Sequence, residues 1–388
     1  MKNTSNVKEK VLIVIPIINN YKIFKDTFYY KDNIENRKSE TISLIQALNV
    51  KVLDVLSIKI NNFSSANLFN KNALDSILKS TEKLKISLLI IDFQLSPVQQ
   101  RNLELFLKVK VIDRTQVILE IFSSRAISRE GKIQVELAAL NFQKTRLVRS
   151  WTHLERQRGG SGFLGGPGER QIELDRRIIN KNIKNLNTNL QKVVKTRSIQ
   201  NSKRKNSSSI IVSLVGYTNT GKSTLFNNLT NSSVVSKNML FATLDPTLRL
   251  MKHEMSYKNK IILSDTVGFI SSLPTELVES FKSTLEFIRE SDFLLIVNDV
   301  SDKNIKDKYD LILKTLKSIG IKDNYLKKKV INVFNKCDLV PDLKQDIFNS
   351  NFKNSIFTSS FNVDDIKKLK KKIYEFSNSI NDNYVQNV

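Results

Sequence analysis

The chain has 388 residues, and its 62 Lys or Arg against 38 Asp or Glu give a formal net charge of +24. This length allows two or three domains with separate cores, and the single cysteine, Cys337, excludes a disulfide framework. The charge points to a polyanionic partner: nucleic acid first, and second an anionic membrane surface that would hold the protein weakly.

Two further features narrow the class of protein. With two histidines, His-based metal chemistry is not expected. No apolar run approaches the ~18–20 residues of a membrane span, so we expect a cytoplasmic protein without a transmembrane segment. A generally lysine-rich composition would also raise the total charge, so local basic clusters carry more weight than the sum.

Short apolar runs alternate with amphipathic segments over the first part of the chain. Buried strands are predicted at 10–18, 50–60, 86–93 and 109–114, and helices at 40–48, 73–80 and 96–108. The last helix has Ser96 as its N-cap and Pro97 in its first turn. We therefore predict a small parallel α/β domain over 1–115, which has no phosphate loop and suits a scaffold or partner-binding role.

Residues 116–206 have a helical pattern that a glycine-rich stretch interrupts. Ile133, Leu137, Leu140 and Leu147 form one apolar stripe before it. After it, a coiled-coil spacing of four and three residues runs through Ile179, Ile183, Leu186, Leu190 and Val193. The pattern predicts an antiparallel helical hairpin with the glycine-rich loop at its tip.

The glycine-rich loop, Gly159–Gly168, holds six of the chain's eleven glycines. It contains a literal G-x-G-x-x-G, but no buried strand precedes it and no acidic residue follows at the distance that a dinucleotide site needs. Ten Lys or Arg lie between Arg176 and Lys205 with no acid among them. These features favour RNA contact, with a flexible hinge as the alternative. The predicted contact residues are Gly159, Gly160, Gly162, Phe163, Gly165, Gly166, Arg176 and Arg177.

A second α/β domain is predicted over 207–380, with strands at 210–215, 260–265, 292–300 and 328–338. The first strand leads into a complete P-loop, G-x-x-x-x-G-K-S, which a helix follows. Its backbone N–H groups would cradle phosphates, with Lys222 on the β- and γ-phosphates and Ser223 on Mg²⁺. The predicted phosphate-binding residues are Gly216, Tyr217, Thr218, Asn219, Thr220, Gly221, Lys222, Ser223 and Thr224.

Three later motifs complete a GTPase pattern. A D-x-x-G motif would hold Mg²⁺ through water and bond the γ-phosphate, and it comprises Asp265, Thr266, Val267 and Gly268. An N-K-x-D motif selects guanine, because its aspartate accepts two hydrogen bonds that adenine cannot donate, and it comprises Asn335, Lys336, Cys337 and Asp338. A loop after a short strand would support the base with Ser359, Ser360 and Phe361.

Between the P-loop and the D-x-x-G motif, a threonine is needed to complete the Mg²⁺ shell. The candidates lie in Phe241, Ala242, Thr243, Leu244 and Asp245, with Thr243 preferred and Thr247 second. The predicted metal ligands are thus Ser223, Thr243 and, through water, Asp265, and the predicted catalytic groups are Lys222, Thr243, Gly268 and Asn219.

Two residues bear on the rate of hydrolysis. Phe269 stands where other GTPases carry a glutamine that orients the attacking water, so slow intrinsic hydrolysis is expected. Asn219 resembles the asparagine of potassium-dependent GTPases, which makes K⁺ a candidate cofactor beside Mg²⁺; the alternative is a side chain that only bonds the loop backbone.

Taken together, these motifs resemble the HflX family of ribosome-associated GTPases over nearly the whole chain. The resemblance rests on RQRGGSGFLGGPGERQIELDRR ahead of GYTNTGKST, then FATLDPT, DTVGFI and NKCD in order. It implies that a monomer binds GTP or GDP and the large ribosomal subunit with its rRNA, and splits ribosomes or rescues stalled ones. The alternatives are an rRNA-binding GTPase of ribosome assembly and a regulatory switch controlled by its nucleotide.

Overall fold

The structure, a computed structural model, describes residues 9–18, 34–48, 50–61, 64–157, 167–205, 209–232, 241, 247–252, 260–266, 268–270, 288–340, 352 and 354–385. They divide into two compact units. The first contains the described residues up to Ser124 and Lys132–Leu190, and the second contains Arg125–Gly131 and the other described residues from Gln191 onward. Among these residues no helix has the length and apolar content to cross a membrane.

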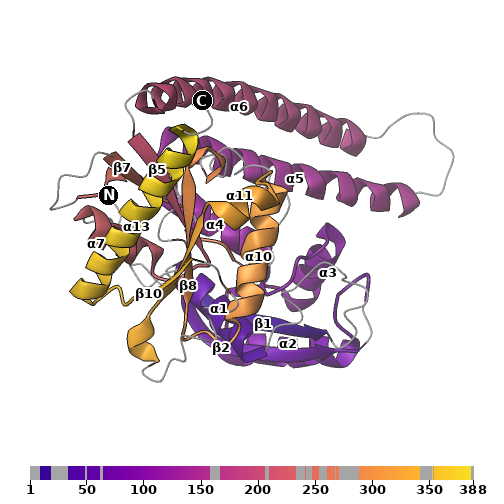
Figure 1. The fold of residues 1–388 in the computed structure, drawn as a ribbon. Coiled ribbons are helices and arrows are strands. Elements are labelled where there is room, and N and C mark those ends of the chain that lie inside the picture. Colours follow the sequence, from indigo (N-terminus) through magenta and orange to yellow (C-terminus); the bar gives the residue numbers. More distant parts are fainter. Residues whose placement is uncertain are drawn as a thin grey trace, which may run out of the picture. The chain divides into compact units, whose positions relative to one another are not determined.

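The first unit is built on a four-stranded parallel sheet with the order β2-β1-β3-β4 (Figure 1). Its strands are β1 (Lys10–Ile18), β2 (Lys51–Ile60), β3 (Leu88–Ile91) and β4 (Lys110–Asp113). The connecting helices are α1 (Ile34–Gln46), α2 (Lys71–Leu84) and α3 (Pro97–Leu107). Ser96 and Gln99 form a reciprocal capping box at the start of α3, with Pro97 in the first turn. The predicted parallel α/β architecture is confirmed.

Three helices follow the first sheet: α4 (Arg114–Arg125), α5 (Arg129–Gln157) and α6 (Pro167–Lys205). The break between α4 and α5 has a local cause, since the Ser128 hydroxyl accepts the N–H of Gly131 at 2.9 Å in the manner of an N-cap. Helix α4 is embedded in the core through Val117, Ile118, Ile121 and Phe122, each at most 2% exposed. The expected stripe of α5 is buried at Ile133 and Leu137.

The predicted seam of α6 is visible in its side-chain exposure. Between residues 179 and 193, only the five seam positions are half-buried, and all the others are exposed. Arg197 in the second half of α6 donates to Glu130 in the first turn of α5 at 2.7 Å. The end of one helix therefore meets the start of the other, as the predicted antiparallel hairpin requires, and Figure 1 draws α6 running back along α5.

The second unit contains a six-stranded sheet with the order β10-β9-β8-β5-β7-β6, parallel except for β6. Its strands are β5 (Ser209–Gly216), β6 (Thr247–Leu250), β7 (Lys260–Asp265), β8 (Phe293–Asp299), β9 (Val330–Asn335) and β10 (Ser355–Phe357). Its helices are α7 (Lys222–Thr230), α10 (Ile305–Ser318), α11 (Asp323–Lys328) and α13 (Val363–Val385), with a short 3₁₀ turn at Cys337–Leu339.

Apolar side chains cover both faces of this second sheet. On one face, residues of α7 and α13 such as Leu229 and Leu369 pack with Val212 of β5. On the other face, Ile312 and Leu316 of α10 pack with Ile296 of β8. Covering both faces explains why the strands are near-continuous apolar runs rather than alternating ones.

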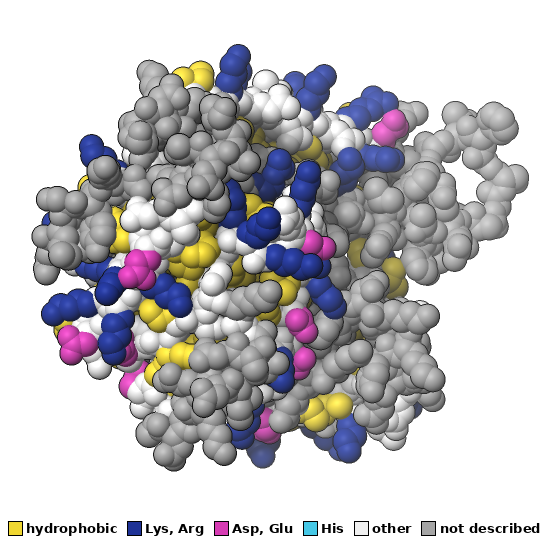
Figure 2. Space-filling model, viewed as in Figure 1, with side chains coloured by type: hydrophobic (Ala, Val, Ile, Leu, Met, Phe, Trp, Pro, Cys, Tyr) yellow, Lys and Arg dark blue, Asp and Glu magenta, His cyan; other side chains and the backbone are white. Residues whose placement is uncertain are grey.

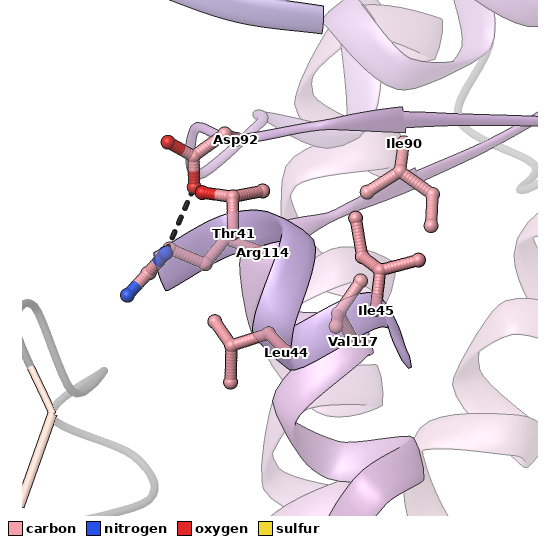
Figure 3. Close-up of a pocket in the computed structure, with 7 residues that line it drawn as sticks. All are labelled: Thr41, Leu44, Ile45, Ile90, Asp92, Arg114 and Val117. Atoms are coloured by element: carbon pink, nitrogen blue, oxygen red, sulfur yellow. Dashed lines mark hydrogen bonds and ion pairs between the residues drawn. The ribbon is translucent and has the colours of Figure 1, made fainter. Parts of the chain in front are cut away.

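Charged groups are buried at the carboxyl end of the first sheet. Asp92, which follows β3, accepts from Arg37 at 3.2 Å and from Arg114 at 2.9 Å, and Arg114 also pairs with Glu40. Figure 3 shows Arg114 reaching Asp92 beside the apolar side chains that line a small hollow. Pairing offsets the desolvation of these charges, so they form a cross-link between α1, β3 and α4.

A second buried carboxylate, Asp113 at the end of β4, links α5 to the sheet. It accepts from Arg146 of α5 at 2.7 Å and from the N–H groups of Leu95 and Gln116. Burial raises the pKa of Asp113, while the Arg146 guanidinium and these hydrogen bonds oppose the rise. Arg146 is thus the countercharge for a carboxylate that water does not reach.

We predict that Arg146→Met destabilises the fold by about 2–3 kcal/mol at pH 7, below the ~3–5 kcal/mol for a fully buried pair, because the Arg146 side chain keeps 18% exposure. Because the pKa of Asp113 is raised in the folded state, its protonation favours folding at low pH and its charge disfavours folding as pH rises. The stability lost by Arg146→Met relative to wild type should therefore shrink from pH 7 towards pH 4. Urea unfolding of the full chain measures this. Lys317→Met, at an exposed pair with Asp323, is the control and should leave the midpoint unchanged; equal stability of the two variants would contradict the prediction.

Candidate nucleotide-binding site

The P-loop turn joins the central strand β5 to α7 at the carboxyl edge of the second sheet. A Cβ at Gly216 would lie 2.3 Å from the Val297 carbonyl oxygen. Gly221 has φ +91° and precedes Lys222, the first residue of α7, and a Cβ there would lie 2.2 Å from the Asn335 amide nitrogen. Close approach and a left-handed backbone therefore both require glycine in this turn. The turn ends at a helix N-terminus, where N–H groups and the helix dipole favour an anion.

Lys222 places a buried ammonium in this turn. Its Nζ donates to the Tyr217 carbonyl oxygen at 2.6 Å. Burial lowers the pKa of Lys222 to about 8, although Asp265 raises it. An ammonium held where water does not solvate it is suited to bind an anion such as a phosphate.

The donors for a metal ion lie beside Lys222. Ser223 donates its hydroxyl hydrogen to the Asp265 carboxylate at 2.7 Å, which places two oxygen ligands together at the ends of β7 and the P-loop. Such hard oxygens fit Mg²⁺, which is usually held by one or two protein groups plus phosphates and water. Among the described residues there is no cluster of three or more His, Cys, Asp or Glu that would suit a metal held by the protein alone.

The D-x-x-G segment is tied to the P-loop by backbone hydrogen bonds. The Phe269 N–H donates to the Gly216 carbonyl at 3.0 Å, and the Thr218 N–H donates to the Phe269 carbonyl at 2.8 Å. The Phe269 ring is 3% exposed and packs in the core with Leu294 and Ile312. It therefore points away from the phosphate-binding side and cannot orient water.

Asn335 joins the other two motifs to the P-loop. It is 1% exposed, its Nδ2 donates to the Thr220 carbonyl at 2.8 Å, and its Oδ1 accepts from the N–H and hydroxyl of Ser360 at 3.1 and 2.9 Å. Asp338, three residues later, is exposed and open to a ligand. Phe361 is 85% exposed next to Ser360.

Cys337, inside the N-K-x-D motif, is held by its surroundings. Its thiol donates to the Phe334 carbonyl at 3.3 Å, and burial raises the pKa of the thiol to about 11. It therefore stays protonated near neutral pH, and its reactivity is low.

The structure thus brings the P-loop, Asp265, Thr266, Gly268, Phe241, the N-K-x-D residues and Ser359–Phe361 into the second unit. Arg176 and Arg177 are exposed on α6. The other predicted site residues lie outside the described residues: Ala242, Thr243, Leu244, Asp245, Val267, Gly159, Gly160, Gly162, Phe163, Gly165 and Gly166.

Sequence reasoning missed two neighbours of the site. Asp299, at the end of β8, pairs with Lys336 at 2.6 Å. Lys308 of α10 lies 4.5 Å from the ring centre of Tyr217 and also pairs with Asp302. The sequence NDVSD at the end of a buried strand could have indicated these neighbours. The carboxyl ends of parallel strands share one edge of the sheet, so acidic residues there lie near the P-loop.

Three family models match the chain in order. They are described as the N-terminal region of a GTP-binding GTPase (residues 35–123), the middle region of the same (125–204) and a 50S ribosome-binding GTPase (211–336). A crystal structure of a GTP-binding protein from Sulfolobus solfataricus in complex with GDP is similar in fold, with a TM-score of 0.50 and 24% identity over 95% of this chain and 99% of that one.

Curated relatives are more similar in sequence. The chain is 43% identical over 308 residues to the GTPase HflX of Magnetococcus marinus, covering 79% of this chain and 70% of that protein. It is 39% identical over 320 residues to the GTPase HflX of Escherichia coli, covering 82% and 74%. With this similarity and a P-loop, an Asp265–Gly268 segment and an N-K-x-D motif gathered in the second unit, the chain belongs to the HflX family and is a GTP hydrolase.

Proposed function

We propose that this GTPase binds the large ribosomal subunit and couples GTP binding and hydrolysis to ribosome splitting or to the rescue of stalled ribosomes. The observation that carries the proposal is the match of residues 211–336 to a family described as 50S ribosome-binding, with the matches to both preceding regions. It acts as a monomer in the cytoplasm, with three domains at 1–115, 116–206 and 207–380.

In this proposal, the P-loop residues Gly216–Thr224 wrap the phosphates of GTP. Lys222 binds the β- and γ-phosphates, and the Gly268 N–H binds the γ-phosphate and detects its loss. Ser223 and Thr243 ligate Mg²⁺ directly and Asp265 through water; when bound, the ion neutralises phosphate charge. Thr243, in the segment Phe241–Asp245, completes the Mg²⁺ shell when the γ-phosphate is present.

Guanine is selected by Asp338, with Asn335 fixing the loops around it. Lys336, Cys337, Ser359, Ser360 and Phe361 complete the base-binding edge. The Lys336–Asp299 ion pair at 2.6 Å supports this edge by holding the lysine side chain in place. Adenine has an acceptor at N1 and no amino group at C2, so it would leave the Asp338 carboxylate without its two partners, and adenine nucleotides bind weakly.

Asn219 supports a role for K⁺ in the same site. It has φ +62° and is exposed, and no hydrogen bond of its side chain occurs within the described part of the chain. The side-chain oxygen of Asn219, which bonds no other described residue, could therefore ligate a monovalent cation beside the phosphates. We include K⁺ as a second cofactor in the proposal, and comparing hydrolysis in potassium and sodium salts tests it.

The surface of α6 supports the RNA-binding part of the proposal. Its exposed basic residues are Arg176, Arg177, Lys181, Lys184, Lys192 and Lys195. Figure 2 shows Lys and Arg side chains outnumbering Asp and Glu along α6, at the top of the view. Such residues bind the phosphate backbone, and the loop of Gly159, Gly160, Gly162, Phe163, Gly165 and Gly166 then contacts rRNA.

The buried Phe269 ring favours a second candidate, a regulatory switch whose bound nucleotide controls partner binding with hydrolysis incidental. Without a water-orienting side chain at this position, turnover by the protein alone is slow. Turnover with and without ribosomes distinguishes the two candidates, because only the first requires stimulation by ribosomes.

We predict that Asp338→Asn weakens GTP binding by about 100-fold or more, since two hydrogen bonds to a charged group are lost. The same variant should gain affinity for xanthosine triphosphate, whose O2 accepts from an amide. Titration calorimetry with both nucleotides measures the change. Asp323→Asn, at an exposed aspartate of α11, is the matched control; an unchanged GTP affinity for the Asp338 variant would refute the assignment.

We predict that large ribosomal subunits accelerate GTP hydrolysis by the full chain, and that replacing Phe163–Pro167 with Ser and Gly removes the acceleration and the splitting of ribosomes. GTP affinity should not change, because the loop has no part in nucleotide binding. A Gly-Ser-Gly replacement of Asn206–Ser208 controls for added flexibility. Full splitting by the Phe163–Pro167 variant would show that the loop is only a hinge, and lost GTP affinity would show that it was misassigned.

A further inference from the structure

The Thr218 side chain in the P-loop is buried without a hydrogen bond. The residue is 6% exposed, and its hydroxyl has no partner within the part of the chain that the structure describes. Neighbouring buried threonines differ: Thr220 donates to the Tyr217 carbonyl at 3.0 Å and Thr266 to the Leu214 carbonyl at 2.6 Å. A buried hydroxyl without a partner is unfavourable, so its retention in this turn calls for a ligand that supplies the bond.

The position of Thr218 points to the ligand. A Cβ built on Gly268 would lie 2.8 Å from the Thr218 Cγ2 and 3.0 Å from the Lys222 Nζ. The Thr218 side chain, Gly268 and the Lys222 ammonium therefore surround one place. Lys222 and the Gly268 N–H are the two proposed γ-phosphate ligands, so this inference rests on the proposed function.

The backbone holds Thr218 in this place. Its N–H donates to the Phe269 carbonyl at 2.8 Å, and Phe269 is anchored by its buried ring and by its own N–H bond to Gly216. Because its ring is packed in the core, the Phe269 side chain cannot take part in hydrolysis. From this bridge the Thr218 methyl group faces Gly268 and Lys222, and a rotation about χ1 brings the hydroxyl to the same place.

We propose that the Thr218 hydroxyl donates a hydrogen bond to a γ-phosphate oxygen and stabilises the charge that develops there during hydrolysis. In the reaction, the water oxygen bonds to the γ-phosphorus, the bond to the bridging oxygen breaks and its electron pair leaves with GDP, and a proton of the water passes to an oxygen of the released phosphate. The hydroxyl keeps its proton throughout, and acts as a preorganised donor. It binds GTP and the transition state but not GDP, which lacks the γ-phosphate.

The test is single-turnover hydrolysis of saturating GTP by the full chain without ribosomes, comparing wild type with Thr218→Val and Thr218→Ser. The valine variant keeps the shape and loses the hydroxyl, and its rate should fall about 10- to 100-fold, the range for one hydrogen bond to a charged group. The serine variant should keep most of the rate. GDP affinity should stay within about two-fold in both, and affinity for GDP with aluminium fluoride should fall only in the valine variant.

Two controls separate chemistry from folding. Thr230→Val makes the same change at a buried threonine of α7 whose hydroxyl bonds the Phe226 carbonyl at 2.7 Å, and it should hydrolyse GTP at the wild-type rate. Thermal unfolding without nucleotide should show Thr218→Val at least as stable as wild type, since it removes an unpaired buried hydroxyl.

Each outcome bears on the proposal. Wild-type hydrolysis by Thr218→Val would overturn it, as would a serine variant as slow as the valine one or a loss of GDP affinity equal to the loss of rate. Because no ribosomes are present, these outcomes leave the ribosomal part of the proposed function untouched. Failure of ribosomes to stimulate the wild-type protein would overturn only that part.

Discussion

The Asn335 amide is the interaction on which the geometry of the nucleotide site depends. Its nitrogen bonds the P-loop at Thr220, and its oxygen takes two hydrogen bonds from Ser360. Three loops that are 115 and 25 residues apart in the chain thereby share one side chain. At 1% exposure, the amide has no water to replace a lost partner. Any movement of one loop must therefore break a buried hydrogen bond or carry the other loops with it.

This constraint also explains the composition of the P-loop. The Asn335 nitrogen occupies the space where a side chain on Gly221 would stand, 2.2 Å from an ideal Cβ. The glycine is thus required by a residue more than a hundred positions away as well as by its own φ of +91°. The P-loop and the N-K-x-D loop therefore constrain each other.

Much of the fold could be predicted from the sequence because the strands are buried on both faces and are therefore continuous apolar runs. The start of α3 could be predicted as well, because Ser96 at the N-cap, Pro97 after it and Gln99 three residues after the cap all act locally. The break between α4 and α5 was not predicted, because an apolar pattern continues on both sides of Ser128. Pairing of Arg146 with Asp113, or of Lys336 with Asp299, depends on strand register and helix placement that no local pattern contains.

For the site, motif spacing predicted which loops meet, and parallel-strand topology explains why they meet at one edge. It could not predict what each side chain does there. Phe269 was expected to be inert towards water, but its burial in the core and its bonds to the P-loop follow only from the tertiary structure. The Thr218 hydroxyl, which has no partner among the described residues, likewise cannot be predicted from a motif that allows any residue at that position.

Left-handed backbone occurs at helix ends, at two other positions and in the predicted nucleotide site. Among the described residues other than glycine, positive φ occurs at Lys85, Lys108 and Asn231, each a helix C-cap whose N–H bonds back to the last turn, and at Leu68 and Asn354, which are neither helix C-caps nor part of the predicted site. Asn219, Phe241 and Lys336 also have positive φ, but none of them ends a helix, and each lies in a predicted nucleotide-binding segment. Left-handed backbone is unfavourable for residues other than glycine. It therefore persists only where the surrounding structure imposes it. For Lys336, the ion pair of its own side chain with Asp299 and the hydrogen bonds of the preceding residue, Asn335, hold this conformation. Three of the left-handed positions therefore lie in loops that are predicted to fit a ligand, and none of those described lies within a strand of the sheet beneath them.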